Sequence, residues 1–375
     1  MDDSLFPYAN LPRLVVETKD FQTVKNTEDY IDGKMQLYDA EAPYSDVVEL
    51  VIRGRGNSSF SAPKNAYRIK LDRKGGLLGM PPNRDWVLIP NYMDKSLLRN
   101  FVASKMASIN SSSWIPQSYF VELHFNRNYQ GVYQLSEKIE VSKERVNLPK
   151  GGYLVEVDYK NKAGEQIVSS KSSVPFRVHY PKDAPDSVLD KLVKHINEFE
   201  DYLENDSISM ASLGKWVDLE SYIKYYWIQE LSKNIDGAYK TSVFFTWDGK
   251  GPIVMGPIWD FDAAYGAAYA TVPTGWLVRK KYWNQHLFKN EAFAREVRKY
   301  WLEHRGDYAS IADSILSYGN GLALAARNNF ERWPILGENT LLSQSVEVFD
   351  DYEQAVLSFR DWLLSRMKWI DEQYE

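Results

Sequence analysis

The spacing of hydrophobic residues changes along this 375-residue chain, and the change constrains the fold more than any single motif does. In the first half, hydrophobic and polar residues alternate over short stretches such as 66–71, which is the period of a half-buried strand. From about residue 183, hydrophobic residues recur every three or four positions, most clearly at 188–203, as on one face of a helix. The pattern predicts an α+β protein with a sheet-rich N-terminal part, residues 11–160, and a helix-rich C-terminal part, residues 161–375.

The individual segments follow from the same patterns. We expect strands at residues 14–18, 47–53, 66–71 and 152–158. One hairpin is expected from 118–125 and 131–135 with a turn at 126–128, and another from 242–246 and 253–255. Helices are expected at 97–109 with Ser96 as the cap, and at 188–203, 216–231, 291–304, 310–327 and about 341–373.

Composition and charge exclude several classes of protein. The formal net charge of −6 provides no cationic surface for a phosphate backbone, which argues against a nucleic-acid-binding protein. No apolar run approaches the roughly 20 residues that a transmembrane helix needs. The absence of cysteine excludes disulfides, thiol catalysis and cysteine-ligated zinc.

The compartment follows less directly from the sequence. The first residues, Met1-Asp2-Asp3-Ser4, lack the basic and apolar regions of a signal peptide. A chain without cysteine fits a bacterial exported protein as well as a cytosolic one. We expect an exported or cell-surface bacterial protein whose signal has been removed, with a cytoplasmic location as the alternative.

Three aspartates flank the second predicted hairpin. Asp260 and Asp262 follow it, and a bend between them would let both carboxylates bind one hard cation or hold two. Asp236 precedes the hairpin, and Gly237 permits a sharp turn there. Because the ends of a hairpin lie close together, we expect Asp236 and Asp260 to meet. One aspartate for the acceptor hydroxyl and one for the metal is the arrangement of protein kinases, although each motif alone also fits a structural turn.

A lysine in the first half is the candidate for binding phosphate. Lys70 ends a predicted strand that follows the glycine-rich loop 54–59, a position from which a lysine can reach nucleotide phosphates. An edge-strand lysine that faces water has the same pattern. Glu137 and Glu156 are candidate partners, and each also fits a structural role.

A series of short motifs occurs in a fixed order along the chain. They are Arg53-Gly54-x-Gly56-Asn57-Ser58-Ser59, Pro63-Lys64-x-x-Tyr67-Arg68-x-Lys70, Leu78-Gly79-Met80-Pro81, Asn91-Tyr92-x-Asp94-x-Ser96-Leu97-x-Arg99-Asn100, Gly131-Val132-Tyr133-x-Leu135-x-Glu137, Gly152-Tyr153-Leu154-x-Glu156-x-Asp158 and Gly256-Pro257-Ile258-Trp259-Asp260-Phe261-Asp262. As an ordered set they resemble the CotH family, the spore coat protein H kinases. The resemblance runs from about residue 11 to residue 270, beyond which only the helical character fits.

The resemblance implies an atypical protein-kinase-like, two-lobed fold that binds ATP with Mg²⁺ or Mn²⁺ and phosphorylates serine or threonine hydroxyls of a partner protein. By position, Asp236 matches the catalytic-loop aspartate and Asp260 the metal-binding aspartate, and we expect Asp262 to add a metal ligand. The residues expected around the nucleotide are Lys70, Arg53, Arg55 and Glu137.

One position departs from the family pattern. Spore-coat members carry Asp-x-x-x-x-Asn in the catalytic loop, whereas Thr241 stands five residues after Asp236, with Ser242 next. A hydroxyl is a poorer cation ligand than an amide oxygen. Either Asp262 compensates, or the site has lost activity while the fold remains.

Two other functions remain open at this stage. The 12 Trp and 25 Tyr, together with paired carboxylates, also fit a glycan-binding or glycan-hydrolysing surface protein. Thr241 also fits a non-catalytic scaffold of the same fold. The identity of the acceptor and the oligomeric state leave no pattern in the sequence.

Overall fold

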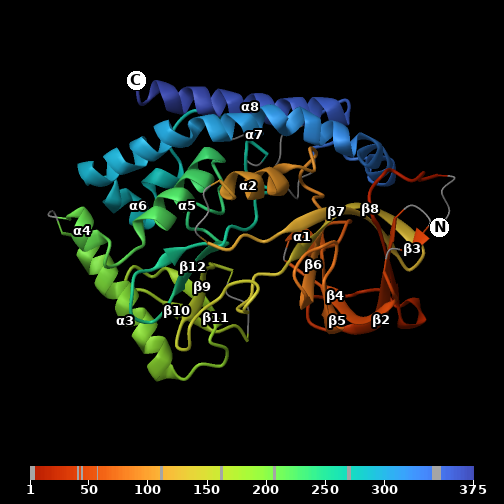
Figure 1. Cartoon of the computed structure of the whole chain (residues 1–375), viewed down its shortest axis with the longest axis horizontal. Coiled ribbons are helices and arrows are strands. Elements are labelled where there is room, and N and C mark those ends of the chain that lie inside the picture. The colour runs from red at the N-terminus through yellow and green to blue at the C-terminus, as the bar shows by residue number, and fades with distance from the viewer. Residues whose placement is uncertain are drawn as a thin grey trace. The chain divides into compact units, whose positions relative to one another are not determined.

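The computed structural model describes residues 5–39, 42–43, 45–56, 58–109, 113–160, 164–205, 208–267, 272–339 and 348–375 (Figure 1). The chain forms two compact units, each discontinuous in sequence. The first, here termed the barrel unit, comprises Met1–Arg99, Pro116–Lys138 and Ser314–Arg360. The second, here termed the carboxylate unit, comprises Asn100–Ile115, Ile139–Asp313 and Asp361–Glu375. Within the described ranges, no helix is both long and apolar enough to span a bilayer.

The barrel unit is built on seven strands that close into a barrel. The strand order is β1-β7-β8-β6-β5-β4-β2, and pairing of β1 with β2 closes the ring. Only the β1–β7 pair is parallel among these neighbours. A short strand, β3 (Ala42–Pro43), extends the edge at β2. The strands of the barrel are β1 (Arg13–Thr18), β2 (Ile31–Asp39), β4 (Val48–Gly54), β5 (Tyr67–Gly75), β6 (Asn83–Ile89), β7 (Ser118–Phe125) and β8 (Asn128–Glu137).

Alternation along each strand separates the inside of the barrel from the outside. In β5, Ile69 and Leu71 belong to the buried core, whereas Arg68 and Lys70 lie on the outer face. Trp86 lies opposite Ile69 in the neighbouring strand and is fully buried. The alternating pattern of the first half therefore predicted correctly which face is buried.

Two short helices and the ends of two long ones complete this unit. The short ones are η1 (Lys19–Phe21) and α1 (Ser58–Ser61). The C-terminal part of α7 (Glu291–Arg332) packs on the barrel, where Lys64 Nζ donates to Asn329 Oδ1 at 2.8 Å and to the carbonyl of Pro90 at 2.7 Å. Burial lowers the pKa of Lys64 well below its ordinary value, and these acceptors identify it as a structural lysine.

The carboxylate unit is built on a five-stranded sheet of order β10-β11-β9-β12-β13. All neighbours in this sheet are antiparallel. One face packs against α3 and α6 around the fully buried Trp283, which contacts Phe176, Phe199 and Phe245. The strands are β9 (Tyr153–Val157), β10 (Ile167–Ser169), β11 (Pro175–Tyr180), β12 (Val243–Trp247) and β13 (Val254–Met255).

Helices supply the rest of the carboxylate unit. The N-terminal part of α7 and the C-terminal part of α8 (Tyr352–Glu372) lie side by side, joined by a hydrogen bond from Trp301 Nε1 to Asp371 Oδ1 at 2.8 Å (Figure 1). The remaining helices are α2 (Arg99–Ala107), α3 (Asp186–Leu203), α4 (Met210–Leu213), α5 (Leu219–Leu231), η2 (Val278–Lys280) and α6 (Tyr282–Leu287).

The predicted fold class is confirmed at the level of mixed α and β structure, with a sheet-rich N-terminal region and helices toward the C-terminus. Two helix predictions were wrong. A single helix, α7, runs through Gly306 where two helices were expected, because a glycine costs only about 1 kcal/mol in a helix that tertiary packing stabilises. The last helix begins at Tyr352 rather than near residue 341, although residues 341–347 lie outside the described part. The kinase-like arrangement of lobes stays a prediction.

Candidate active site

Asp236 lies in a tight turn just after α5. Its carbonyl accepts hydrogen bonds from the backbone N–H groups of Lys240 and Thr241, both at 3.1 Å, which folds the chain back toward β12. Position 237 needs a glycine because the Gln229 side chain lies too close to leave room for a Cβ atom. A Cβ at this position would lie 1.9 Å from Oε1 of the buried Gln229. The sequence therefore places the Asp236 carboxylate at a defined point at the start of the β12–β13 hairpin.

Asn234 connects the turn that carries Asp236 to the segment that carries Asp260. Its Oδ1 accepts from the backbone N–H of Asp236 at 3.2 Å, and its Nδ2 donates to the carbonyl oxygen of Asp260 at 3.1 Å. The Asn234 side chain is fully buried. One side chain thus bonds to the backbones of both predicted catalytic positions.

Asp260 occupies a bend after the hairpin. Its φ of 69° is left-handed, so Trp259-Asp260-Phe261-Asp262 is not an extended strand. The carboxylate Oδ2 accepts from the Ser242 hydroxyl at 3.1 Å, and the next residue, Phe261, donates its N–H to Asn100 Oδ1 at 2.8 Å. The bend that two metal-binding carboxylates at Asp260 and Asp262 would need is therefore present.

The carboxylates of Asp236 and Asp260 lie close enough to influence each other. Burial raises the pKa of Asp236, and the negative charge of Asp260 raises it further. Lys160 and Lys240 act in the opposite direction, and Lys240 Nζ lies 3.9 Å from Asp236 Oδ1. The structure thus brings together two of the three predicted aspartates, which are 24 positions apart in the sequence.

A third carboxylate reaches the same turn through a threonine. The Thr241 hydroxyl donates to Asp158 Oδ1 at 3.2 Å, and Asp158 is buried. Thr241 therefore bonds to Asp158, whereas the neighbouring Ser242 bonds to Asp260. The hydroxyls of Thr241 and Ser242 thus orient two different aspartates.

Asp260, beside Asp236, fits a ligand of a divalent cation that is shared with phosphate groups. Among the residues that the structure describes, no group of three His, Asp or Glu side chains converges to form a complete protein cage for a metal. Mg²⁺ is usually held by one or two carboxylates, with water and substrate phosphates as the other ligands. Burial is the main cause of the raised pKa of Asp236, and a cation on Asp260 would offset the smaller contribution from the Asp260 charge.

Asp262 lies in the turn at residues 262–267 and is half-buried. It belongs to the carboxylate unit together with Asp236 and Asp260. Its role as a further metal ligand stays a prediction.

The residues expected around the nucleotide lie in the barrel unit, on both faces of the wall. Lys70 is half-buried on the outer face, opposite Asp85 of β6, and that carboxylate pairs with Arg68 at 2.5 Å. Glu137 is fully buried and lies opposite Trp86, on the inner face, where it accepts from the Gln117 N–H at 2.9 Å. Because side chains alternate between faces, Glu137 does not face Lys70.

The two arginines also lie near the outer face of the barrel. Arg53 stacks over the Tyr30 ring at 5.1 Å, and Arg55 is half-buried with its N–H bonded to the Ala66 carbonyl at 3.0 Å. Glu156, the other candidate partner of Lys70, lies in the carboxylate unit and bonds to His179 Nε2 at 2.7 Å. The contribution of Lys70, Arg53, Arg55 and Glu137 to a nucleotide site stays a prediction.

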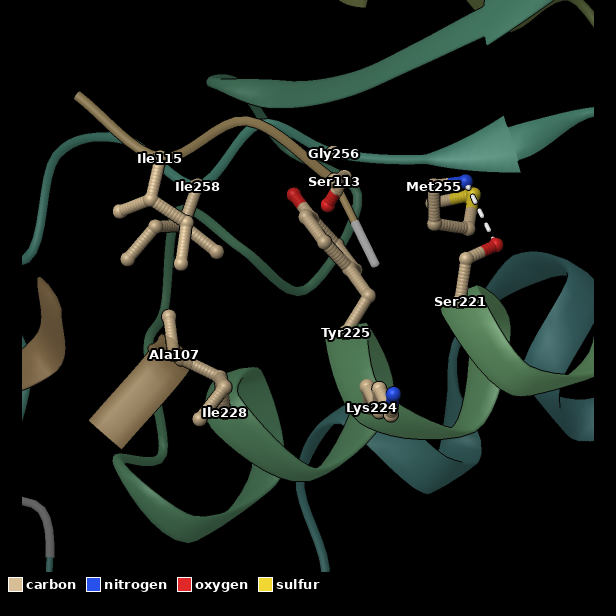
Figure 2. Close-up of a pocket in the computed structure, with 10 residues that line it drawn as sticks. All are labelled: Ala107, Ser113, Ile115, Ser221, Lys224, Tyr225, Ile228, Met255, Gly256 and Ile258. Carbon is tan, nitrogen blue, oxygen red and sulfur yellow. Dashed lines mark hydrogen bonds between the residues drawn. The ribbon is translucent and has the colours of Figure 1, made fainter. Parts of the chain in front are cut away.

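A pocket is lined in part by the segment 255–258, which precedes Asp260, and in part by α5 (Figure 2). Its walls include the side chains of Ile115, Ile228 and Ile258, and the Ser221 hydroxyl on α5 accepts from the Met255 N–H at 3.1 Å. Gly256 has a left-handed φ of 111°, and a Cβ there would lie 3.1 Å from Ser113 Oγ. None of the predicted site residues lines this pocket, although its lining includes Met255, Gly256 and Ile258, which precede Asp260 in the sequence.

Sequence reasoning missed the roles of Asn234, Asp158 and Ser242. Asn234 stands two residues before Asp236, a spacing typical of asparagine turns, and this was the available signal. Asp158 was visible only as a member of a motif. Its contact with Thr241 joins residues 83 positions apart, which no local pattern reveals.

The comparisons with known proteins agree with the motif series. No protein of curated function matches the sequence. The family model described as CotH kinase protein matches residues 52–370, which is most of the chain. The chain belongs to the CotH kinase family.

Proposed function

We propose that this protein is an ATP- and divalent-metal-dependent phosphotransferase with an atypical protein-kinase-like fold, which phosphorylates hydroxyl groups of partner proteins. The observation that carries the proposal is the meeting of Asp236 and Asp260 at the ends of one hairpin, braced by Asn234. Family membership supports it, because the family is described as a kinase family.

The two aspartates take different roles in this proposal. Asp236 is half-buried, and its raised pKa makes it a better proton acceptor than an ordinary aspartate. It orients the acceptor hydroxyl and takes its proton. Asp260, with Asp262, holds Mg²⁺ or Mn²⁺, which would neutralise charge on the nucleotide phosphates. Ser242 fixes the orientation of the Asp260 carboxylate through its hydroxyl.

The reaction balances as an ordinary phosphoryl transfer. The acceptor oxygen forms a bond to the γ-phosphorus of ATP, the bond to the β-γ bridging oxygen breaks, and ADP leaves with that electron pair. The hydroxyl proton passes to the Asp236 carboxylate. Positioning and electrostatics supply most of the rate, because the loose transition state needs little covalent help. Lys70, Arg53 and Arg55 are the cations that would neutralise phosphate charge, whereas the buried Glu137 lies on the face of the barrel wall opposite to Lys70.

The two rival functions receive less support from the structure. Four tryptophans, Trp86, Trp227, Trp283 and Trp301, are fully buried in the cores, so the aromatic content does not require a sugar-binding surface. The Thr241 hydroxyl bonds to Asp158 and the Ser242 hydroxyl bonds to Asp260. These defined contacts favour a functional site over a non-catalytic scaffold.

Replacing Asp236 by asparagine tests the proposal directly. Asp236→Asn keeps the shape and removes the proton acceptor, so the rate of transfer from [γ-³²P]ATP should fall by about 10²–10⁴-fold. Removal of divalent metal with EDTA should abolish transfer by the wild type, and added Mn²⁺ should restore it. Asp190→Asn, an exposed aspartate on α3, serves as the control. Equal activity of Asp236→Asn and wild type would contradict the role of Asp236.

A further inference from the structure

Two exposed lysines and a tyrosine lie beside the Asp236 turn; we term Tyr159, Lys160 and Lys240 the lysine lip. The Tyr159 N–H donates to the Lys240 carbonyl at 3.4 Å, so the two segments adjoin. The Lys160 N–H donates to Asp158 Oδ1 at 2.9 Å, the same oxygen that Thr241 contacts. Tyr159 is 52% exposed, which is unusual for a residue with a large aromatic ring.

Both lysines act on the catalytic turn. Lys240 Nζ lies 3.9 Å from Asp236 Oδ1, and the Lys240 side chain is 55% exposed. Lys160 is exposed and is anchored beside the same turn, because its N–H and the Thr241 hydroxyl both bond to Asp158 Oδ1. The positive charge of the lip therefore extends to the oxygen that would receive the acceptor proton.

Stability alone does not account for this placement. At 3.9 Å and with the lysine side chain 55% exposed, the Lys240–Asp236 pair is screened by solvent, so it adds only about 0–1 kcal/mol to the fold. The chain as a whole is acidic, with a net charge of −6, and Asp158, Asp236 and Asp260 come together at this turn. Cations and an exposed ring at this place match a ligand with negative charge and some apolar surface.

We propose that the lysine lip recognises acidic side chains flanking the acceptor hydroxyl, so that the acceptor is an acidic serine- or threonine-containing segment of a protein. This inference rests on the proposed function. Carboxylates of the acceptor bind Lys160 and Lys240, and Tyr159 packs against the neighbouring residue of the peptide. Binding of Lys240 to the acceptor also draws this ammonium from Asp236 as the hydroxyl arrives.

The test uses three synthetic peptides with one central serine flanked by glutamate, lysine or alanine. Transfer is measured from [γ-³²P]ATP with Mn²⁺ to each peptide. The wild type should prefer the glutamate peptide. The double variant Lys160→Glu/Lys240→Glu should lose about tenfold in kcat/KM for that peptide and gain for the lysine peptide, with KM for ATP unchanged.

The matched control is Lys194→Glu. Lys194 lies on α3 and forms an exposed pair with Glu198 at 3.8 Å, with the same spacing of four residues as Lys240 and Asp236. This variant should keep the wild-type order of peptides. The same order in the double variant would overturn the proposal. So would a change confined to KM for ATP, which would assign the lysines to nucleotide phosphates.

A binding measurement separates this inference from the proposed function. Fluorescence anisotropy of the labelled peptides, with wild-type protein and with the double variant, needs no phosphoryl transfer. If no peptide is phosphorylated but the glutamate peptide binds best and the double variant reverses the order, the lip is supported and the phosphotransferase proposal fails. If the three peptides bind equally well, the lip is contradicted whether or not transfer occurs.

Discussion

Asn234 is the residue that fixes the spacing between the two candidate catalytic positions. It accepts from Asp236 and donates to Asp260, and its burial leaves no water to replace either bond. Both contacts are to the backbone, so Asn234 is a positioning residue. Its amide supplies one acceptor and one donor, whereas an ionised aspartate of the same shape supplies acceptors only.

We predict that Asn234→Asp reduces phosphoryl transfer by about tenfold or more, because an oxygen replaces the donor to the Asp260 carbonyl. The added negative charge should also move the acid limb of the rate–pH profile to higher pH, since it raises the pKa of Asp236 further. A purely structural role would lower activity equally at all pH values. An unshifted acid limb would therefore contradict the positioning role.

The raised pKa of Asp236 also predicts how stability depends on pH. Because the folded protein holds this proton more tightly than the unfolded chain, Asp236 favours folding at low pH, and that contribution is lost as pH rises through its folded pKa. In metal-free buffer, Asp236→Asn should therefore raise the Tm near pH 7–8. The gain should vanish below about pH 3.9, the ordinary value for an unfolded aspartate. A gain of the same size at both pH values would show that charge is not its cause.

At the scale of residues, the sequence best predicted which side chains meet where a short hairpin joins them. Asp236 and Asp260 were expected to meet because a turn at Asp248-Gly249 joins two short strands, and they do. The pairing of Thr241 with Asp158 was not predictable, because it depends on β9 lying beside β12. Ser96 was expected to cap α2, but its hydroxyl accepts from the Leu98 N–H, which precedes the helix, and the first N–H of α2, that of Arg99, donates to Asp94 Oδ2 at 2.8 Å.

At the scale of elements, the segment after Asp262 is held by a buried ion pair. Glu230 on α5 and Arg366 on α8 are fully buried and lie 2.7 Å apart. Arg366 also donates to the carbonyls of Pro273 and Gly275, at 2.9 and 2.8 Å. Glu230 accepts from the Leu277 N–H at 2.9 Å. Two helices thus fix the backbone that follows the candidate metal-binding residues.

We predict that Arg366→Met destabilises the protein by about 3–5 kcal/mol, because it leaves the Glu230 charge buried without its partner. The double variant Arg366→Met/Glu230→Leu should recover much of the loss. The control is Arg295→Met, which removes an exposed pair with Glu291 at 3.6 Å and should change stability by less than about 1 kcal/mol. Chemical denaturation measures all three. A loss for Arg366→Met no larger than that of the control would contradict this account.

Element boundaries were less predictable than element types. The alternation at 66–71 and the helical spacing at 188–203 identified β5 and α3 correctly, since each has one buried face. The strand at 152–158 was also predicted correctly, as β9, whereas β6 was not predicted because most of its residues are buried, which removes the alternation from which strands are predicted. Gly306 was interpreted as a break because local propensity does not record the tertiary packing that keeps α7 continuous.

At the scale of the whole molecule, the barrel and the discontinuous units required the structure. Closure depends on β1 pairing with β7 in parallel, across about 100 residues, and with β2 on its other side. Neither contact leaves a local signal. The chain passes between the two units several times. The boundary before Ser314–Arg360, which belongs to the barrel unit, falls inside the single helix α7. The family resemblance, in contrast, was predictable from ordered motifs because these fix turns and buried polar contacts.

The central claim is that Asp260 holds the divalent cation of a nucleotide site beside Asp236, and calorimetric titration with Mn²⁺ and a non-hydrolysable ATP analogue tests it most directly. The account predicts binding to the wild type and to Asp190→Asn, and a Kd weakened by more than about tenfold in Asp260→Asn. Affinities that are equal in wild type and Asp260→Asn would contradict it.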